Sequence, residues 1–362
     1  MKGLNLFLLI ILILSTSCEE DSTTPRALVG SVGSGGWSIP DDEIYDGGPG
    51  KDGIPALENP TMISADEATL GEDDLVVGVV FDGQARAYSH QVLDWHEIIN
   101  DQIGMHPFAV TYCPLTGTAI NWSRNIGGEI TTFGVSGLLY NSNLIPYDRK
   151  TDSNWSQMLN RSVEGSLIGQ SATTILPAIE TSWGTWKKMY PKTQIVSTNT
   201  GHERPYGSYP YIASGNFDYR VEPFLIFPVA REDERLHKKE RVLGVQDIGR
   251  VHIYRFKDFQ GDINLRKDDL IARQIVIAGS TDLNFMVAYQ ASLKEGTRLD
   301  FSALSGEDLP NLMTDQLGNT WDIFGQAVSG PNVGEKLYQP KSYIGYWFAW
   351  VAFNAEVEII EF

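Results

Sequence analysis

The chain has 362 residues, of which 46 are acidic and 28 are basic, so its formal net charge is −18 at pH 7. A surplus of negative charge repels nucleic-acid phosphates and anionic lipid headgroups, and we therefore expect no nucleic-acid partner. The length is sufficient to bury a large core, either as one compact body or as two packed halves.

The first 18 residues are typical of a signal peptide. One lysine precedes an apolar run from Leu6 to Leu14, which is too short to span a bilayer as a mature helix. The small residues before Cys18 resemble a bacterial lipoprotein cleavage box, which predicts that Cys18 is lipidated and anchors the chain in a membrane. The acidic residues 19–21 resemble the tag that directs some lipoproteins to the cell surface. We therefore expect an outer-membrane lipoprotein, facing either the periplasm or the exterior, and secretion with an unmodified Cys18 is the alternative.

Residues 19–50 are rich in Gly, Pro, Ser, Thr and Asp, which predicts an acidic tether. Beyond the tether, we expect a first β unit over residues 51–235 and a second, degenerate β unit over residues 236–362. One fused domain over residues 44–362 is the alternative.

Short segments of strand composition, such as LVVGVVF, FAVTYC and QIVIAG, predict a mainly β protein with a few short helices. Turns are expected at Asp82-Gly83 and at Gly127-Gly128. The apolar spacing in residues 89–103 predicts one helix, and residues 182–191 predict a second helix that ends before Pro191. The aromatic run YWFAWVAF at 346–353 predicts a buried strand.

Two stretches of the chain resemble each other at an offset of 166 residues. Four residues of the first stretch recur in the second: Gly78, Gly83, Tyr88 and Trp155 correspond to Gly244, Gly249, Tyr254 and Trp321. This match predicts an internal duplication, with two β units that close as a pseudo-twofold barrel or sandwich. Ligand sites are common where such units meet.

Cys113 is the residue with the clearest chemical potential. It ends an apolar strand in VTYCPLTGTA, and the aligned position in the second stretch is Gly279. If Cys18 is acylated, Cys113 is the last free thiol and no internal disulfide can form. Both inert packing and a functional thiol are consistent with this placement.

Two histidines are candidate partners of Cys113. His96 lies on the apolar side of the predicted helix in DWHEIIND, and His237 lies in the charged segment DERLHKKER. Thiolate and imidazole ligands suit copper or zinc, so Cys113, His96 and His237 form a candidate metal site. A hydrogen-bonded core histidine at 96 and a solvated one at 237 are the alternatives.

The polar run SGLLYNSNLIPYDRKTDSNWSQ supplies candidate pocket residues, namely Asn141, Asp148, Trp155 and Gln157. The same side chains can instead satisfy loop backbone, and we favour that structural role because the pattern recurs in the second stretch.

Five separated motifs, KDGIPAL, WHEIIND, VTYCPLTGTA, FGVSGLLYNSNLIPYDRKTDSNWSQ and RLHKKERVLGV, resemble those of the bacterial and archaeal family called domain of unknown function 3179. The resemblance covers roughly Ile44 to Gly330 and implies no established activity. Many members resemble a YCPLCGTA form, whereas this chain has Thr116 in place of the second cysteine. A dithiol redox couple is therefore excluded here.

Three classes of function remain open from the sequence. The first is a copper or zinc site on Cys113. The second is an envelope enzyme for acyl or glycosyl transfer, with Cys113 as nucleophile and His96 as base. The third is a binding module in which tryptophans and the polar run hold a glycan or a protein.

Overall fold

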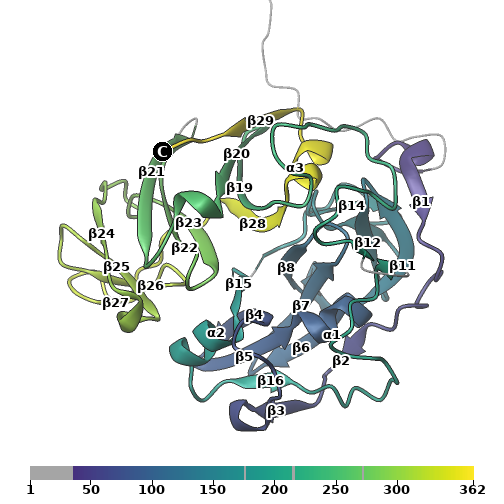
Figure 1. Cartoon of the computed structure of the whole chain (residues 1–362), viewed down its shortest axis with the longest axis horizontal. Coiled ribbons are helices and arrows are strands. Elements are labelled where there is room, and N and C mark those ends of the chain that lie inside the picture. The colour runs from purple at the N-terminus through teal and green to yellow at the C-terminus, as the bar shows by residue number, and fades with distance from the viewer. Residues whose placement is uncertain (1–35, 175–176, 214–216, 271–272) are drawn as a thin grey trace, which may run out of the picture.

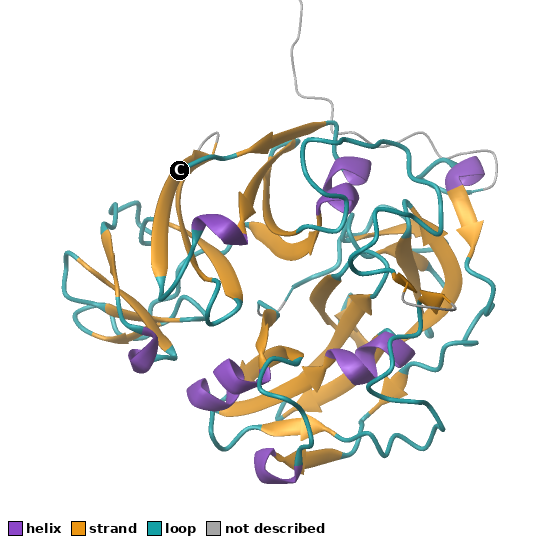
Figure 2. Cartoon of the chain, in the orientation of Figure 1, coloured by secondary structure: helices purple, strands orange, loops and turns teal. Residues whose placement is uncertain are grey.

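The computed structural model of the chain describes residues 36–174, 177–213, 217–270 and 273–362. Short antiparallel hairpins dominate it, because runs of three to eight strand-forming residues are separated by tight turns. Asp82 and Gly83, for example, both have positive φ and connect two strands at the predicted turn. The prediction of a mainly β fold with a few short helices is confirmed (Figure 2).

The six main sheets are arranged as a six-bladed β-propeller (Figure 1). The predicted pseudo-twofold barrel or sandwich is wrong. Each sheet has only three to five short strands, so no sheet is wide enough to close on itself or to cover another large sheet. Small sheets packed around a common centre bury their faces against their neighbours instead.

The first three blades are built from the first half of the chain. Blade one contains β3 (Met62–Ser64), β4 (Leu75–Phe81), β5 (Gln84–Ser89), β15 (Ile179–Ser182) and β16 (Gln194–Val196). Blade two contains β2 (Leu57–Glu58), β6 (Ile98–Ile103), β7 (His106–Cys113) and β8 (Thr118–Ser123). Blade three contains β1 (Ile44–Asp46), β11 (Phe133–Tyr140), β12 (Asn143–Asp148), β13 (Asn154–Ser156) and β14 (Arg161–Glu164).

The last three blades come from the second half. Blade four contains β19 (Arg241–Asp247), β20 (Arg250–Arg255), β28 (Lys341–Tyr346) and β29 (Glu356–Ile359). Blade five contains β21 (Asn264–Leu270), β22 (Arg273–Ser280) and β23 (Phe285–Gln290). Blade six contains β24 (Phe301–Ala303), β25 (Asn311–Asp315), β26 (Thr320–Asp322) and β27 (Ala327–Ser329).

Two small hairpins and several short helices complete the described chain. The hairpins are β9 (Asn125–Ile126) with β10 (Glu129–Ile130), and β17 (Ile212–Ala213) with β18 (Phe217–Asp218). The α-helices are α1 (His90–His96), α2 (Trp183–Met189) and α3 (Trp347–Phe353). The 3-10 helices are η1 (Asp41–Glu43), η2 (Ala65–Glu67), η3 (Phe256–Asp258) and η4 (Gly306–Asp308).

The helix predictions had mixed outcomes. The second predicted helix is α2, and the Ser182 side chain caps it by accepting a hydrogen bond from the Thr185 amide. The first stops at His96, because Glu97 has a φ of +57° and Ile98 begins strand β6. The run at 346–353 forms α3 rather than a strand, and this helix is buried on nearly every side.

Each half of the chain follows the same path. A hairpin (β4–β5 or β19–β20) starts a blade, and the chain then builds two further blades. It returns to the first blade as an antiparallel strand (β15 or β28), a short helix (α2 or α3) and an outer parallel strand (β16 or β29). Among the innermost strands, β28 packs beside β8 and β15 packs beside β23. The centre of the propeller therefore joins the two halves.

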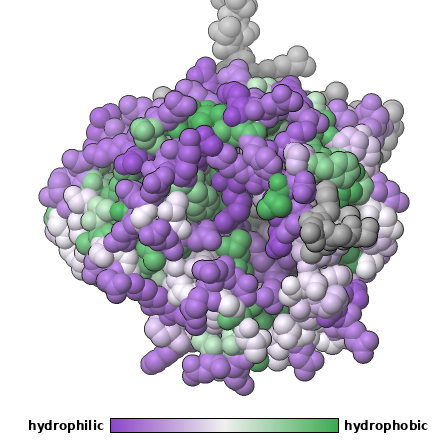
Figure 3. All heavy atoms as spheres, viewed as in Figure 1, coloured by the Kyte–Doolittle hydropathy of each residue, from purple (hydrophilic) through white to green (hydrophobic). Residues whose placement is uncertain are grey.

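The structure describes only part of the N-terminal region for which a signal peptide and a tether are predicted. Strand β1 lies inside the predicted tether but pairs with β11, so this portion is ordered against blade three. Cys18 and the signal peptide fall outside the described residues. Within the described ranges, no helix has the length and apolar character needed to cross a membrane. The surface in Figure 3 mixes hydrophilic and hydrophobic side chains.

Candidate active site

Cys113 is sealed inside the protein. Its side chain is 1% exposed, and its sulfur lies 3.6 Å from the Ser142 carbonyl oxygen. Burial raises the pKa of the Cys113 thiol to about 11, and the nearby Glu97 carboxyl adds to this shift. The thiol is therefore protonated at neutral pH, which is unfavourable for a nucleophile or a metal ligand.

His96 is also buried, and both of its ring nitrogens have partners. Nδ1 lies 2.7 Å from the Pro55 carbonyl, which can only accept, so Nδ1 carries the proton. Nε2 then accepts from the Tyr206 hydroxyl at 2.6 Å. Burial lowers the pKa of His96 to about 4. The ring is a neutral, hydrogen-bonded core group, which is the alternative that the sequence left open.

The predicted three-ligand metal site is not assembled. His237 is exposed, and its Nδ1 accepts a hydrogen bond from the Lys239 amide. Over the described part of the chain, which includes Cys113, His96 and His237, no three His, Cys, Asp or Glu side chains group in a way that could hold a metal ion.

The four candidate pocket residues of the polar run hold the scaffold together. Gln157 is buried, where it accepts from Asn143 at 2.7 Å and donates to the Thr111 carbonyl at 3.0 Å. Asn141 bonds the backbone of residues 230 and 352. Asp148 accepts from the indole nitrogen of Trp155 at 3.1 Å. Their geometry agrees with the structural role favoured from the sequence.

A pocket of about 380 Å³ lies where blades one, two and four meet, and Tyr112, which precedes Cys113, is part of its lining. Helix α1, the β7–β8 turn and the strands β15, β19 and β28 contribute to its wall, as do residues 207–209 and 220–221. We call it the acid–base pocket. Its ionisable and aromatic lining residues are Asp73, Asp74, His90, Asp94, Tyr112, Glu180, Tyr209, Arg220, Lys239, Arg241 and Tyr346.

Four buried polar atoms of this pocket have no hydrogen-bond partner among the residues that the structure describes. They are His90 Nε2, Asp94 Oδ1, Glu180 Oε2 and Arg241 Nε. His90 Nε2 and Glu180 Oε2 approach each other to 3.6 Å, which is beyond good hydrogen-bond length. Buried polar groups are normally paired, so four orphans in one pocket indicate a place where a ligand or water completes the bonding.

Two buried carboxyl groups of the pocket, Asp94 and Glu180, are held in different protonation states. Burial raises the pKa of Asp94 to about 7, although His90 and Arg220 act against this shift. Burial also works to raise the pKa of Glu180, but the charge of Arg241 and the contact with His90 outweigh it and leave the pKa below its ordinary value. Arg241 Nη2 donates to Glu180 Oε1 at 2.5 Å. At neutral pH, Asp94 can carry a proton while Glu180 is ionised.

Lys239 stabilises one wall of the pocket. Its ammonium donates to the carbonyls of Tyr219 (2.9 Å) and Phe224 (2.9 Å), and it lies 3.1 Å from the centre of the Tyr219 ring. Burial lowers the pKa of Lys239 to about 7. The lysine therefore holds the segment that carries Arg220 against the propeller.

A comparison with protein families identifies the chain. The model of the family described as "Protein of unknown function (DUF3179)" matches residues 51–357. The chain belongs to this family. Comparisons with curated proteins and with solved structures gave no match. The DUF3179 match spans every wall of the acid–base pocket, whereas Cys18 lies before it.

In this DUF3179 member, several residues of the acid–base pocket stand beside the candidate residues of the sequence. Asp94 lies in DWHEIIND beside His96, Tyr112 precedes Cys113, and Arg241 closes the motif that holds His237. His90 lies in none of the five family motifs. Glu180 had no local signal, since only the return of the chain to blade one brings it to the pocket.

Proposed function

We propose that the acid–base pocket binds a small polar substrate and supports general acid–base catalysis, with Asp94 as the proton donor and Glu180 as the ionised partner. The observation that carries the proposal is the separation of the two carboxyl pKa values within one pocket that also holds four unpaired polar atoms. Opposite protonation states of two nearby acids are a recurring mark of acid and base roles.

Glycosyl transfer or hydrolysis is the reaction class that we infer for this pair. Such reactions need one protonated carboxyl to donate to the leaving oxygen and one ionised carboxyl to act as nucleophile or base. Arg241 and His90 keep Glu180 ionised, and the tyrosines of the lining offer hydroxyl groups that can bond sugar hydroxyls. Acyl transfer through Cys113 has less support, because the thiol is protonated and His96 is engaged elsewhere.

The first test measures the protonation states directly. In protein labelled with ¹³C at the carboxyl groups, the resonance removed by Asp94→Asn should titrate near pH 7. The resonance removed by Glu180→Gln should titrate below the range of an ordinary glutamate. An Asp94 that titrates near pH 4 would contradict the proposal.

The second test measures catalysis on a panel of p-nitrophenyl glycosides. We expect turnover of at least one, and a loss of about 100-fold or more in kcat for Asp94→Asn and for Glu180→Gln. Cys113→Ser is the matched control and should keep its kcat. Turnover that survives both carboxyl variants, or no turnover of any glycoside, would rule out glycosyl chemistry in this pocket.

The location of the protein is a separate part of the proposal. We propose that it is an outer-membrane lipoprotein anchored through Cys18, on the basis of the apolar run and the small residues before this cysteine. Globomycin, which blocks the lipoprotein signal peptidase, should leave the precursor unprocessed, and so should Cys18→Ala. Normal processing in either case would show ordinary secretion instead.

A further inference from the structure

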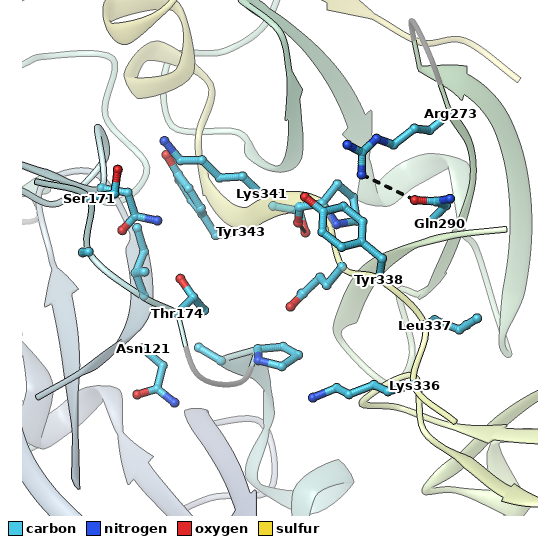
Figure 4. Close-up of a pocket in the computed structure, with 18 of the residues that line it drawn as sticks. Asn121, Ser171, Thr174, Arg273, Gln290, Lys336, Leu337, Tyr338, Lys341 and Tyr343 are labelled. Carbon is cyan, nitrogen blue, oxygen red and sulfur yellow. Dashed lines mark hydrogen bonds between the residues drawn. The ribbon is translucent and has the colours of Figure 1, made fainter. Parts of the chain in front are cut away.

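A second and larger cavity lies at the other end of the innermost strands. Gly117, which directly precedes β8, borders the acid–base pocket, whereas Asn121 within β8 borders this cavity. On β28, Tyr346 borders the acid–base pocket, and Lys341 and Tyr343 border the cavity. A narrow space lined in part by Glu180 and Tyr343 lies between the two. The cavity, which we call the cationic cavity, has a volume of about 840 Å³ and is shown in Figure 4.

The charge of this cavity is opposite to that of the protein. Its wall carries four basic side chains, Arg273, Lys294, Lys336 and Lys341, and within the described ranges no aspartate or glutamate lines it. The whole chain, in contrast, has 46 acidic and 28 basic residues. A hollow lined by one sign of charge concentrates ions of the other sign, so this cavity attracts anions.

Two of the basic groups, Lys341 and Arg273, are held in place by the wall itself. Lys341 Nζ donates to the carbonyls of Met158 (2.9 Å) and Leu159 (3.3 Å). The Arg273 guanidinium lies 4.6 Å from the centre of the Tyr338 ring and reaches Gln290 Oε1 at 3.4 Å. None of these partners is a carboxylate, so the positive charge of Arg273 and Lys341 remains available to a ligand. Lys336 has one carboxylate, Asp322, close enough to act on its pKa, which burial nevertheless lowers.

Asn121 provides an independent sign of a ligand. Its side chain is 1% exposed, yet neither its amide nitrogen nor its amide oxygen has a partner in the part of the chain that the structure describes. Figure 4 shows Asn121 and Lys336 approaching the cavity from opposite sides. A buried amide left unpaired costs about 1 to 3 kcal/mol, and one donor beside one acceptor matches a sugar hydroxyl pair.

The cavity also offers an aromatic surface. Tyr338 is 53% exposed and stands in the middle of the view in Figure 4, where Arg273 covers one side of its ring. An exposed tyrosine next to polar groups suits a ring-shaped ligand that has apolar faces and polar edges. The volume falls in the range of pockets for drug-sized molecules, which runs from about 300 to 1,000 Å³.

From these observations we propose that the cationic cavity binds an acidic sugar, with the carboxylate held by Arg273 and Lys336, the hydroxyls by Asn121, and a ring face against Tyr338. The site does not depend on catalysis in the acid–base pocket. It would serve as a separate binding subsite at the opposite end of the propeller.

Calorimetric titration of the full mature chain tests the proposal with three probes: digalacturonic acid, the neutral galactobiose, and inorganic phosphate. We expect digalacturonic acid to bind at least about tenfold more tightly than galactobiose, and to weaken when NaCl is raised to about 0.5 M, because salt screens charge pairs. Phosphate should bind more weakly than digalacturonic acid, since it has neither ring nor hydroxyl pair.

Variants assign the binding to the cavity. Arg273→Gln and Lys336→Gln should each weaken digalacturonic acid by about threefold to tenfold, and Asn121→Ala should weaken both sugars. Lys150→Gln, at an exposed lysine paired with Glu129, is the matched control and should change nothing. Asp94→Asn should also change nothing, which separates this site from the acid–base pocket.

Three results would overturn the proposal. They are equal binding of the acidic and neutral sugars, phosphate that binds as well as digalacturonic acid, and affinity that survives both Arg273→Gln and Lys336→Gln. Circular dichroism of each variant checks folding. Because Lys336 lies on the surface, its variant tests the cavity even if Asn121→Ala does not fold.

Discussion

The first three blades and the last three blades have the same internal supports but different chemistry. Gly78 leaves room for the Trp186 ring, and Gly244 leaves room for the Trp350 ring. Tyr88 donates to Asp101 at 2.6 Å, and Tyr254 donates to Asp268 at 2.5 Å. Trp155 and Trp321 donate in the same way to Asp148 and Asp315.

The halves differ after the first hairpin and at the end of one strand. Helix α1 follows β5 and carries His90 and Asp94, whereas the 3-10 helix η3 follows β20 at the corresponding place. Cys113 ends strand β7 opposite Thr118, and Ser280 ends β22 opposite Phe285. By strand position, the residue of the second half that corresponds to Cys113 is therefore Ser280 rather than Gly279, the residue expected from the sequence match. The contacts that both halves share support the fold, whereas His90 and Asp94 of the proposed site lie on a helix that only the first half has at this place. An internal duplication as the origin of the match stays a prediction.

The largest effect should come from filling either glycine gap. A Cβ at Gly78 would lie 2.2 Å from the Trp186 ring, and one at Gly244 would lie 2.2 Å from the Trp350 ring. Gly78→Ala and Gly244→Ala should each lower the free energy of unfolding by more than about 3 kcal/mol, as measured by urea denaturation. Gly71→Ala, where a Cβ has ordinary contacts, is the control. A half that tolerates its alanine would break the comparison.

The next largest effect is a pH dependence of stability caused by Asp94, which only the first half should show. The pKa of folded Asp94 is about 7, above its unfolded value, so between about pH 4 and pH 7 the folded state keeps a proton that the unfolded state has lost. The contribution of Asp94 to stability therefore falls as pH rises through this window and stays low above it. Asp94→Asn should remove this loss and gain roughly 2 to 4 kcal/mol at pH 8 relative to pH 4.5.

Urea denaturation of both proteins at the two pH values measures the effect. The difference between variant and wild type cancels other buried acids, such as Glu97 with its pKa raised to about 7. A difference that does not change with pH would show that Asp94 is an ordinary carboxylate.

A smaller and symmetric effect should follow from the paired aspartates. Asp101 accepts from Tyr88 and Arg86, and Asp268 accepts from Tyr254 and His252. Asp101→Asn and Asp268→Asn should each cost about 1 to 3 kcal/mol, because each weakens charge-assisted bonds to buried donors. Thermal unfolding of the two variants compares them directly. A cost in one half alone would mean that the shared contact has different roles.

The smallest effect is expected at Cys113. Because its pKa is about 11 and its side chain is buried, iodoacetamide should modify the native protein slowly, and faster only after unfolding in urea. Cys113→Ser should cost about 1 kcal/mol, since the second half already has a buried serine at the paired position. Rapid alkylation of the folded protein at pH 7 would show that the Cys113 thiol is accessible and reactive, and would contradict a purely structural role.

Local patterns predicted local structure well. The Asp82-Gly83 turn, the presence of a helix within 182–191 and the strand content all follow from the preferences of neighbouring residues. The helix over 89–103 was overextended, because the pairing of β6 with β7 outweighed a helical spacing of apolar residues. The composition of the run at 346–353 favours a strand, but packing outweighs this preference and residues 347–353 form a buried helix.

Most tryptophans, which could have formed a ligand-binding surface, are instead packed in the core. The chain has nine tryptophans, and seven of them are fully buried between the blades: Trp122, Trp155, Trp183, Trp186, Trp321, Trp347 and Trp350. They form the core and cannot present an aromatic surface to a glycan. Composition alone does not separate these roles, because a large aromatic side chain serves a core and a binding site equally well.

By itself, the sequence determined the β-rich class, the spacing of the two matching halves and the motifs around the site, because these depend on residues that are neighbours in the chain or repeat at a fixed offset. Only the tertiary structure decided that six small sheets form a ring, that Cys113 and His96 are buried and engaged, and that Glu180 and Arg241 line one pocket with Asp94. Those facts depend on contacts between residues that are distant in the chain: Cys113 is 29 positions from Ser142, His96 is 41 from Pro55, and Glu180 is 61 from Arg241. The pKa of each group follows from that burial and from those neighbours.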